Sequence, residues 1–371
     1  MSTPDDDSPQ RNAPDNSNGH DAGDNIARAD DPTVVTPTLD MLVDVARIHG
    51  MHFSEGADRL LLPWELHRHL LAFTTAPRAY LLSVAQLRCR LSLAEVNSLV
   101  DFLSTWNAER INPTGMFHLT DEGDLSVQFR SHLAVGAGIS MQQLSEFFLK
   151  ATDTSHMAID ELRDNFGEAV YEINDIAMAF EDDRALRTEL VHRYAIDSDD
   201  KLRSLPLHPD FYAHVLDGLA LPAETDDVVP QPVTISRVQE IFAEVGIENS
   251  DAEGDFLVTA INEIFLAAFI DNGPSLLIRG HWDANLDPEV DRLRAFLATN
   301  DWNYAAATTR ALWQEDDNGL QLRVEYAVSV ETGLTDAQLE ENLVIAMHDI
   351  LKAIDGLSLE LSGTSAVRWP E

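Results

Sequence analysis

The sequence predicts an α+β protein made of two tandem copies of one domain, joined by a helical insert. Each copy has the element order α-β-β-β-α-β-β-α, with flanking helices on an antiparallel sheet. Two observations support this fold class. The pattern at residues 138–144 recurs at 333–339, a separation of 195, and the Trp-Asn pair at 106–107 recurs at 302–303, a separation of 196. The two separations differ by one residue, as small loop insertions would produce, so we infer an internal repeat.

The recurring pattern reads glycine, aliphatic residue, hydroxyl residue, two free positions, glutamine and leucine. A Ser or Thr N-cap accepts a hydrogen bond from the third helical residue, whose Gln side chain reaches back to the cap, so the pattern predicts a helix start. A glycine turns the chain into each helix. The residues concerned are Gly138, Ser140 and Gln143 in the first copy, and Gly333, Thr335 and Gln338 in the second.

Apolar spacing and turn residues predict the other elements. The first copy has helices at 38–50 and 93–105 and strands at 59–62, 67–74, 79–87, 116–119 and 125–135. The second has helices at 235–245 and 288–299 and strands at 256–260, 263–270, 275–279, 308–314 and 320–330. Residues 250–255 are expected to form a turn, and Asn318-Gly319 predicts a tight hairpin.

Four segments follow from this assignment: an acidic tail at 1–32, a first domain at 37–165, a helical insert and linker at 166–231, and a second domain at 232–361. The tail holds eight Asp and almost no large apolar residue, so it is expected to be disordered. Apolar stripes in the insert predict helices that pack against a domain.

Composition limits the partners. The formal net charge of −39 repels nucleic acid and anionic membranes and favours basic partners. Cys89 is the only cysteine, which suits a reducing compartment, and no apolar run is long enough to span a bilayer. We therefore expect a cytoplasmic protein with a protein partner, no nucleic acid and no membrane.

Tryptophans are the leading contact candidates. Trp282 and Trp313 occur on or beside strands of the second copy only, and either one would be a partner-binding residue if it is exposed. The repeated residues Trp106, Asn107, Trp302 and Asn303 are instead expected to be structural, with the Trp in the core and the Asn as left-handed helix caps.

No catalytic site is assembled in the sequence. His67 and His69 share a face of one strand and could ligate a metal, but no third ligand is identifiable, and the second copy has Glu263 and Phe265 at the matching positions. Acidic clusters at 181–183 and 197–200 lack the spacing of a calcium loop. Cys89 lies between Arg88 and Arg90, and strand alternation places both arginines on the opposite face, so Cys89 is expected to be buried and inert. We expect no catalytic residue, no cofactor and no bound metal.

The second copy resembles the YbjN family of bacterial domains, described as sensory transduction regulators. The resemblance rests on residues 300–303, on the strand pair 308–330, and on Gly333, Thr335 and Gln338; the first copy keeps the Trp-Asn pair and the glycine motif. That family is similar in fold to type III secretion chaperones, which act as dimers that bind a partner segment. The resemblance implies a dimer-like arrangement of the two copies within one chain.

The expected function is a non-enzymatic, protein-binding adaptor, chaperone-like or regulatory, that uses a sheet face or an interdomain groove. Two alternatives stay open. One is a metal-dependent hydrolase that uses His67, His69 and nearby carboxylates, and the other is a signalling regulator whose acidic tail meets basic partners.

Overall fold

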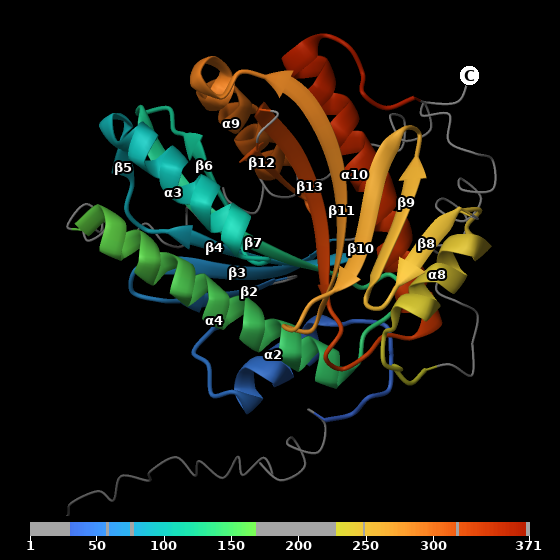
Figure 1. Ribbon diagram of the computed structural model, residues 1–371. Coiled ribbons are helices and arrows are strands. Elements are labelled where there is room, and N and C mark those ends of the chain that lie inside the picture. The colour runs from blue at the N-terminus through green and yellow to red at the C-terminus, as the bar shows by residue number, and fades with distance from the viewer. Residues whose placement is uncertain are drawn as a thin grey trace, which may run out of the picture.

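The computed structural model describes residues 30–56, 59–74, 78–167, 228–247, 249–316 and 319–368. These residues form two repeated halves, each with three α-helices and one antiparallel sheet (Figure 1). The predicted α+β class with two repeated halves is therefore confirmed. Strands beyond the predicted order occur at Ser54–Glu55 and Leu91–Ser92 in the first half and at Ser250–Glu253 in the second. Nearly all of the predicted acidic tail and of the helical insert lies outside the described residues.

The first half carries a sheet with strand order β1-β2-β3-β4-β7-β5, and β6 also pairs with β7. Its helices α2 and α4 pack against each other, and α4 runs along the sheet (Figure 1). The elements are α2 (Leu39–Ile48), β1 (Ser54–Glu55), β2 (Arg59–Pro63), β3 (His67–Thr74), β4 (Tyr80–Leu87), β5 (Leu91–Ser92), the short 3-10 helix η1 (Leu93–Glu95), α3 (Val96–Glu109), β6 (Thr114–Leu119), β7 (Asp124–Ala134) and α4 (Met141–Phe166).

The second half carries a sheet with strand order β12-β13-β11-β10-β9-β8. Its elements are α8 (Ile235–Glu244), β8 (Ser250–Glu253), β9 (Phe256–Ile261), β10 (Ile264–Ile270), β11 (Ser275–Leu286), α9 (Pro288–Ala305), β12 (Arg310–Asp316), β13 (Gly319–Ser329) and α10 (Asp336–Ser362). Two predictions were wrong here. The turn expected at 250–255 contains β8, and β11 continues seven residues beyond the predicted end at Arg279, because its later residues keep pairing with β13.

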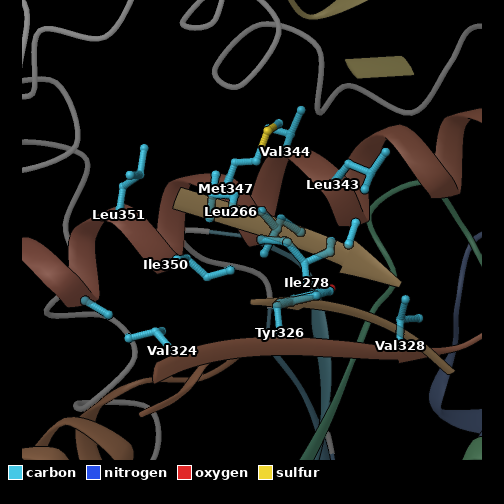
Figure 2. Packing of buried hydrophobic residues seen from close by; sticks show 14 of the residues in the cluster. Leu266, Ile278, Val324, Tyr326, Val328, Leu343, Val344, Met347, Ile350 and Leu351 are labelled. Atoms are coloured by element: carbon cyan, nitrogen blue, oxygen red, sulfur yellow. The ribbon is translucent and has the colours of Figure 1, made fainter. Parts of the chain in front are cut away.

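Helix α10 forms the centre of the largest hydrophobic core. Its side chains pack on β10, β11 and β13, where they meet Leu266, Ile278 and Tyr326 (Figure 2). The same cluster includes Tyr80 and Leu82 of the first sheet. Because α10 contributes to a core shared by both halves, its burial ties the two sheets together.

Both predicted capping boxes are confirmed. Ser140 begins α4 and Thr335 begins α10, each with the reciprocal glutamine hydrogen bond. The preceding glycines have φ of 86° at Gly138 and 78° at Gly333, a left-handed conformation that favours glycine.

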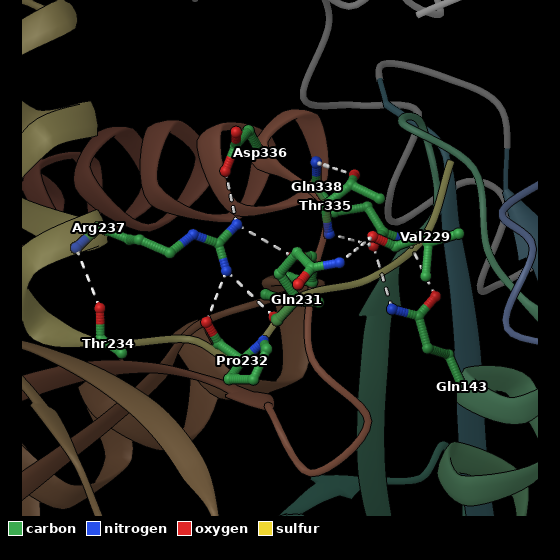
Figure 3. Close-up of polar contacts among 10 residues, drawn as sticks. Gln143, Val229, Gln231, Pro232, Thr234, Arg237, Thr335, Asp336 and Gln338 are labelled. Atoms are coloured by element: carbon green, nitrogen blue, oxygen red, sulfur yellow. Dashed lines mark hydrogen bonds and ion pairs between the residues drawn. The ribbon is translucent and has the colours of Figure 1, made fainter. Parts of the chain in front are cut away.

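The two capping glutamines also join the halves. The Nε2 of Gln143 donates to the Oε1 of Gln338 at 3.0 Å and to the carbonyl of Gly333 at 2.9 Å. In return, Gln338 Nε2 donates to Gln143 Oε1 at 2.9 Å (Figure 3). It also donates to the carbonyl of Gly138 at 3.0 Å. Together with the capping bonds, these contacts use every donor and acceptor site of both buried side-chain amides.

Further polar contacts join the halves nearby. Asn300 on α9 forms two hydrogen bonds, of 2.8 and 2.9 Å, with the backbone of Phe117 on the strand β6. Arg130 donates to the carbonyl of Asn303 at 2.6 Å, and Arg310 of the second half donates to the carbonyl of Ile111 at 3.0 Å. Each half therefore satisfies backbone groups of the other.

Breaking the glutamine pair should destabilise the fold. In Gln143→Leu, the amide of Gln338 and two backbone groups lose partners in a buried place. We expect the free energy of unfolding to fall by about 2 kcal/mol, since an unsatisfied buried polar group costs about 1–3 kcal/mol. Urea unfolding measures this loss.

The matched control is Gln142→Leu, because the half-buried Gln142 side chain makes no hydrogen bond within the described residues. It should change stability by less than about 0.5 kcal/mol. Equal losses in the two variants would contradict the role of the glutamine pair.

Candidate functional site

An open groove of about 470 Å³ lies between α4 and the second sheet. Residues from both halves line it. They come from α4 and the turn before it, from the start of α10 and the turn before it, from the ends of β7 and β13, and from residues 109–112 and 271–275. The groove has the size of typical ligand sites, which are about 300–1,000 Å³.

The groove combines an apolar lining with an acidic rim. Apolar side chains include Phe147, Met157 and Leu334, and Met157 is 40% exposed. Both basic residues of the lining already have carboxylate partners: Lys150 pairs with Glu146 and Glu331 at 2.8 and 2.7 Å, and Arg110 pairs with Glu161 at 3.1 Å and Glu109 at 3.7 Å. Asp271 adds a further carboxylate, so acidic groups outnumber basic ones around the groove.

A filled counterpart of this groove lies between α10 and the first sheet. The strand register shows which residues correspond: Tyr80 pairs with Ala134 as Ser275 pairs with Ser329. The carbonyls of Ala79 and Pro274 likewise accept equivalent backbone hydrogen bonds. Arg78 precedes Ala79 and Gly273 precedes Pro274, so Arg78 corresponds to Gly273. Arginine and tyrosine fill one groove, whereas glycine and serine leave the other open.

The guanidinium of Arg78 is held by charge in the filled groove. Its side chain is 5% exposed, and its Nη1 lies 3.6 Å from Oδ1 of Asp349 on α10. Asp349 also accepts hydrogen bonds from Thr308 at 2.5 Å and His348 at 2.7 Å. Burial alone would raise the pKa of Asp349, but Arg78 and these two donors together lower it below its usual range.

Nearby, Glu341 accepts hydrogen bonds from the backbone N–H groups of Gly136 and Ala137 at 3.0 and 2.9 Å. Burial raises the pKa of Glu341 to about 7, although these two donors and Arg78 lower it. The filled groove therefore encloses a buried cation, Arg78, beside the carboxylates of Asp349 and Glu341.

Trp282 and Trp313 are half-buried rather than exposed. They flank the buried Leu322 across three strands, with ring centroids 6.3 Å apart, and Trp313 donates to the carbonyl of Ala295 at 2.6 Å. Trp313 also lines a second cavity of about 160 Å³. Neither residue lines the larger groove, so their proposed role in partner binding stays a prediction.

The Trp-Asn pairs lie inside helices, so the expectation that the asparagines are left-handed caps was wrong. Asn107 forms two 2.8 Å hydrogen bonds with the backbone of Gly115, and Asn303 does the same with Ala311 at 2.8 and 2.7 Å. Each asparagine thus fixes the strand that follows its helix. Trp106 is buried, and its indole donates to the carbonyl of Pro113 at 2.8 Å.

His67 and His69 are buried beneath α4. The ring of His67 lies 6.1 Å from that of His69 and 4.9 Å from that of His156 on α4. Burial, aided by the neighbouring His69, His156 and Arg88, lowers the pKa of His67 to about 2. Burial and His156 lower the pKa of His69 to about 3.

The assignment of Glu263 and Phe265 as the second-copy counterparts of these histidines was wrong by one residue. His69 pairs with Ala85 as Leu266 pairs with Gly280, so the counterparts are Ile264 and Leu266. Because a one-residue slip moves a strand residue to the other face, the sequence comparison had matched inward histidines to outward residues.

The described residues contain no group of three His, Cys, Asp or Glu side chains placed to hold a metal ion. Cys89 is buried, as predicted. The acidic clusters at 181–183 and 197–200 lie outside the described residues. No helix in the described part of the chain is long and apolar enough to cross a membrane.

Sequence reasoning missed the groove and the residues that distinguish it from its counterpart. The sequence comparison did not match Arg78 with Gly273, because the loop that holds Arg78 has two more residues than the loop that holds Gly273. A residue-by-residue match of the loops, anchored on the strands, would have exposed a large-to-small difference. The available signal was the smaller side-chain volume of Gly273 and Ser275 compared with Arg78 and Tyr80.

The match to a family model agrees with the repeat. The family model YbjN, "Putative bacterial sensory transduction regulator", matches residues 38–164 and 234–358. The chain is also similar to a solved structure titled "Crystal structure of YbjN, a putative transcription regulator from E. coli", with 23% identity over 35% of this chain and 93% of that one, and a TM-score of 0.31. No curated protein matches the chain.

Removing the charge of Arg78 should destabilise the protein. Arg78→Met keeps much of the volume but leaves Asp349 without its cation. Breaking a buried ion pair costs about 3–5 kcal/mol, and we expect the lower end because the Asp349 side chain is 20% exposed. Denaturant unfolding measures the change.

Arg292→Met is the matched control. Arg292 pairs with Asp101 at 3.0 Å, but both side chains are more than 60% exposed. Its loss should cost less than about 1 kcal/mol. If the two variants lose similar stability, Arg78 does not hold the filled groove together.

The buried histidines should make the fold sensitive to acid. An unfolded histidine takes up a proton near pH 6.5, whereas His67 in the fold resists protonation down to about pH 2. The free energy of unfolding therefore falls as the pH drops below about 6.5, by up to about 1.4 kcal/mol per pH unit for each such histidine. In His67→Ile, which introduces the second-copy residue, this slope should be smaller by about that amount.

The slope is measured from urea unfolding at several pH values between about 6 and 4. His52→Ile is the control, because His52 is exposed, and its slope should match the wild type. An unchanged slope in His67→Ile would show that His67 is not a source of the acid sensitivity.

Proposed function

The chain belongs to the YbjN family, and from this membership we propose that it is a non-enzymatic regulator that binds a protein partner through the groove between its halves. The family description supports a regulatory role. The open groove, lined from both halves, is the observation that carries the proposal.

The groove suits a segment of a partner protein. Its lining offers apolar side chains for contact area, such as Phe147 and Met157, and polar groups that fix orientation. Its lining includes residues of α4 in the first half and of β13 and a loop in the second half, so binding there would depend on how the two halves are packed together.

The two halves take the place of a dimer in this proposal. The glutamine pair is reciprocal, with Gln143 and Gln338 contacting equivalent groups of the opposite half. A dimer of identical domains would have two identical grooves. Fusing the copies allows one groove to be filled and the other to remain open for a partner.

No chemistry is assigned to the groove. The alternative of a metal-dependent hydrolase rests on His67 and His69, but both rings are buried. The ring of His67 packs against His156, and Nε2 of His69 lies 2.5 Å from the hydroxyl of Ser83. A regulator that binds without reacting needs no such site. The single Cys89 suits the cytoplasm as its compartment.

Site-specific photo-crosslinking tests the proposal. A photoreactive residue replaces Met157 in the groove or, as the control, Leu359 of α10, which is 48% exposed and outside the groove lining. In an extract of its own cells, the full-length protein should form a defined adduct with another protein from position 157. The same adducts from both positions, or none from 157, would contradict the proposal.

A further inference from the structure

We infer that the open groove receives an arginine side chain from a basic segment of the partner, at the position that Arg78 occupies in the filled groove. This inference rests on the proposed function and names the chemistry of the partner. The filled groove is its template, since the protein itself shows which side chain completes such a site.

Correspondence between the grooves is set by backbone pairing. Ala79 and Pro274 accept equivalent hydrogen bonds from Val135 and Val330, so the residue before each lies at the mouth of its groove. In the first loop that residue is Arg78, buried against α10. In the second it is Gly273, which lines the open groove and adds no side chain.

The surrounding carboxylates favour a cation at this place. Glu146 occupies the same position in α4 as Glu341 does in α10, three residues after the capping glutamine. Its carboxylate already pairs with Lys150 at 2.8 Å, so Asp271 is the carboxylate that is left for an incoming cation. Asp271 accepts hydrogen bonds from the backbone of Gly273 and Ser275 at 2.8 and 3.0 Å, and it has no cationic partner within the described residues. A guanidinium bound here would form an ion pair with the carboxylate of Asp271.

An arginine also matches the shape of the vacant volume. The two largest side chains of the filled groove's loop, Arg78 and Tyr80, are replaced by Gly273 and Ser275. A long side chain with an apolar stem and a charged end would lie against Phe147 while its head reaches the rim. An acidic or purely apolar segment would leave Asp271 unpaired.

The test uses a labelled peptide of about ten residues that carries arginines among leucine and serine, and a second peptide with citrulline in place of each arginine. Citrulline keeps the shape and removes the charge. Binding to the full-length protein is measured by fluorescence anisotropy. The citrulline peptide should bind at least about tenfold more weakly.

Three variants locate the binding site. Gly273→Arg supplies the chain's own arginine and should weaken binding of the arginine peptide at least about tenfold, whereas Gly273→Ala should leave it within about twofold. The added Cβ would lie 3.2 Å from the carboxylate of Asp271, which must shift slightly in both variants, so Gly273→Ala controls for that shift. Val290→Arg adds the same charge at a site that is 76% exposed and should have no effect.

The outcomes separate this inference from the proposed function. If Val290→Arg weakens binding as much as Gly273→Arg, the peptide is attracted only by the net charge of −39, and the inference is overturned. Equal binding of both peptides, blocked by Gly273→Arg, would overturn the arginine while leaving the groove as a binding site. Failure of the arginine peptide to bind would overturn the inference, and crosslinking from position 157 would still decide the proposed function.

Discussion

The pair of side-chain amides from Gln143 and Gln338 is the contact on which the arrangement of this protein depends. Each glutamine closes the first turn of its own long helix and reaches the glycine carbonyl that precedes the other helix. All the polar groups of both amides are thereby satisfied in a buried place, which is the condition under which such a network specifies one arrangement. The start of α4 is fixed relative to the start of α10.

With both helices anchored at equivalent residues, the rest of each helix crosses the opposite half at an equivalent place. The difference between the two crossings comes from side chains. On one side Arg78 and Tyr80 occupy the space, and Asp349 compensates the charge. On the other side Gly273 and Ser275 leave a groove of about 470 Å³. A repeat that would otherwise be symmetric in function has become asymmetric through a few substitutions in one loop.

Local rules were sufficient for much of the fold. The repeat and the capping boxes were predicted because they depend on spacing within a few residues, and most strands were found from alternation. Matching of the copies failed where loop length differed. His67 was assigned to the counterpart Glu263 instead of Ile264, since a loop that is two residues longer shifts the alignment and one residue of error reverses the face of a strand. The asparagines were expected to end helices, but they hold the following strands.

By itself, the sequence determined the two copies, the start of each capped helix and the alternating strands, because these follow from propensity and from hydrogen bonds between near neighbours. The tertiary structure decided which contacts join the two copies. The amide pair joins residues 195 positions apart, and Arg78 meets Asp349 across the boundary between the halves. Contacts at that separation in sequence depend on how the helices cross the sheets. Only the folded chain therefore shows that one groove is filled and the other is open.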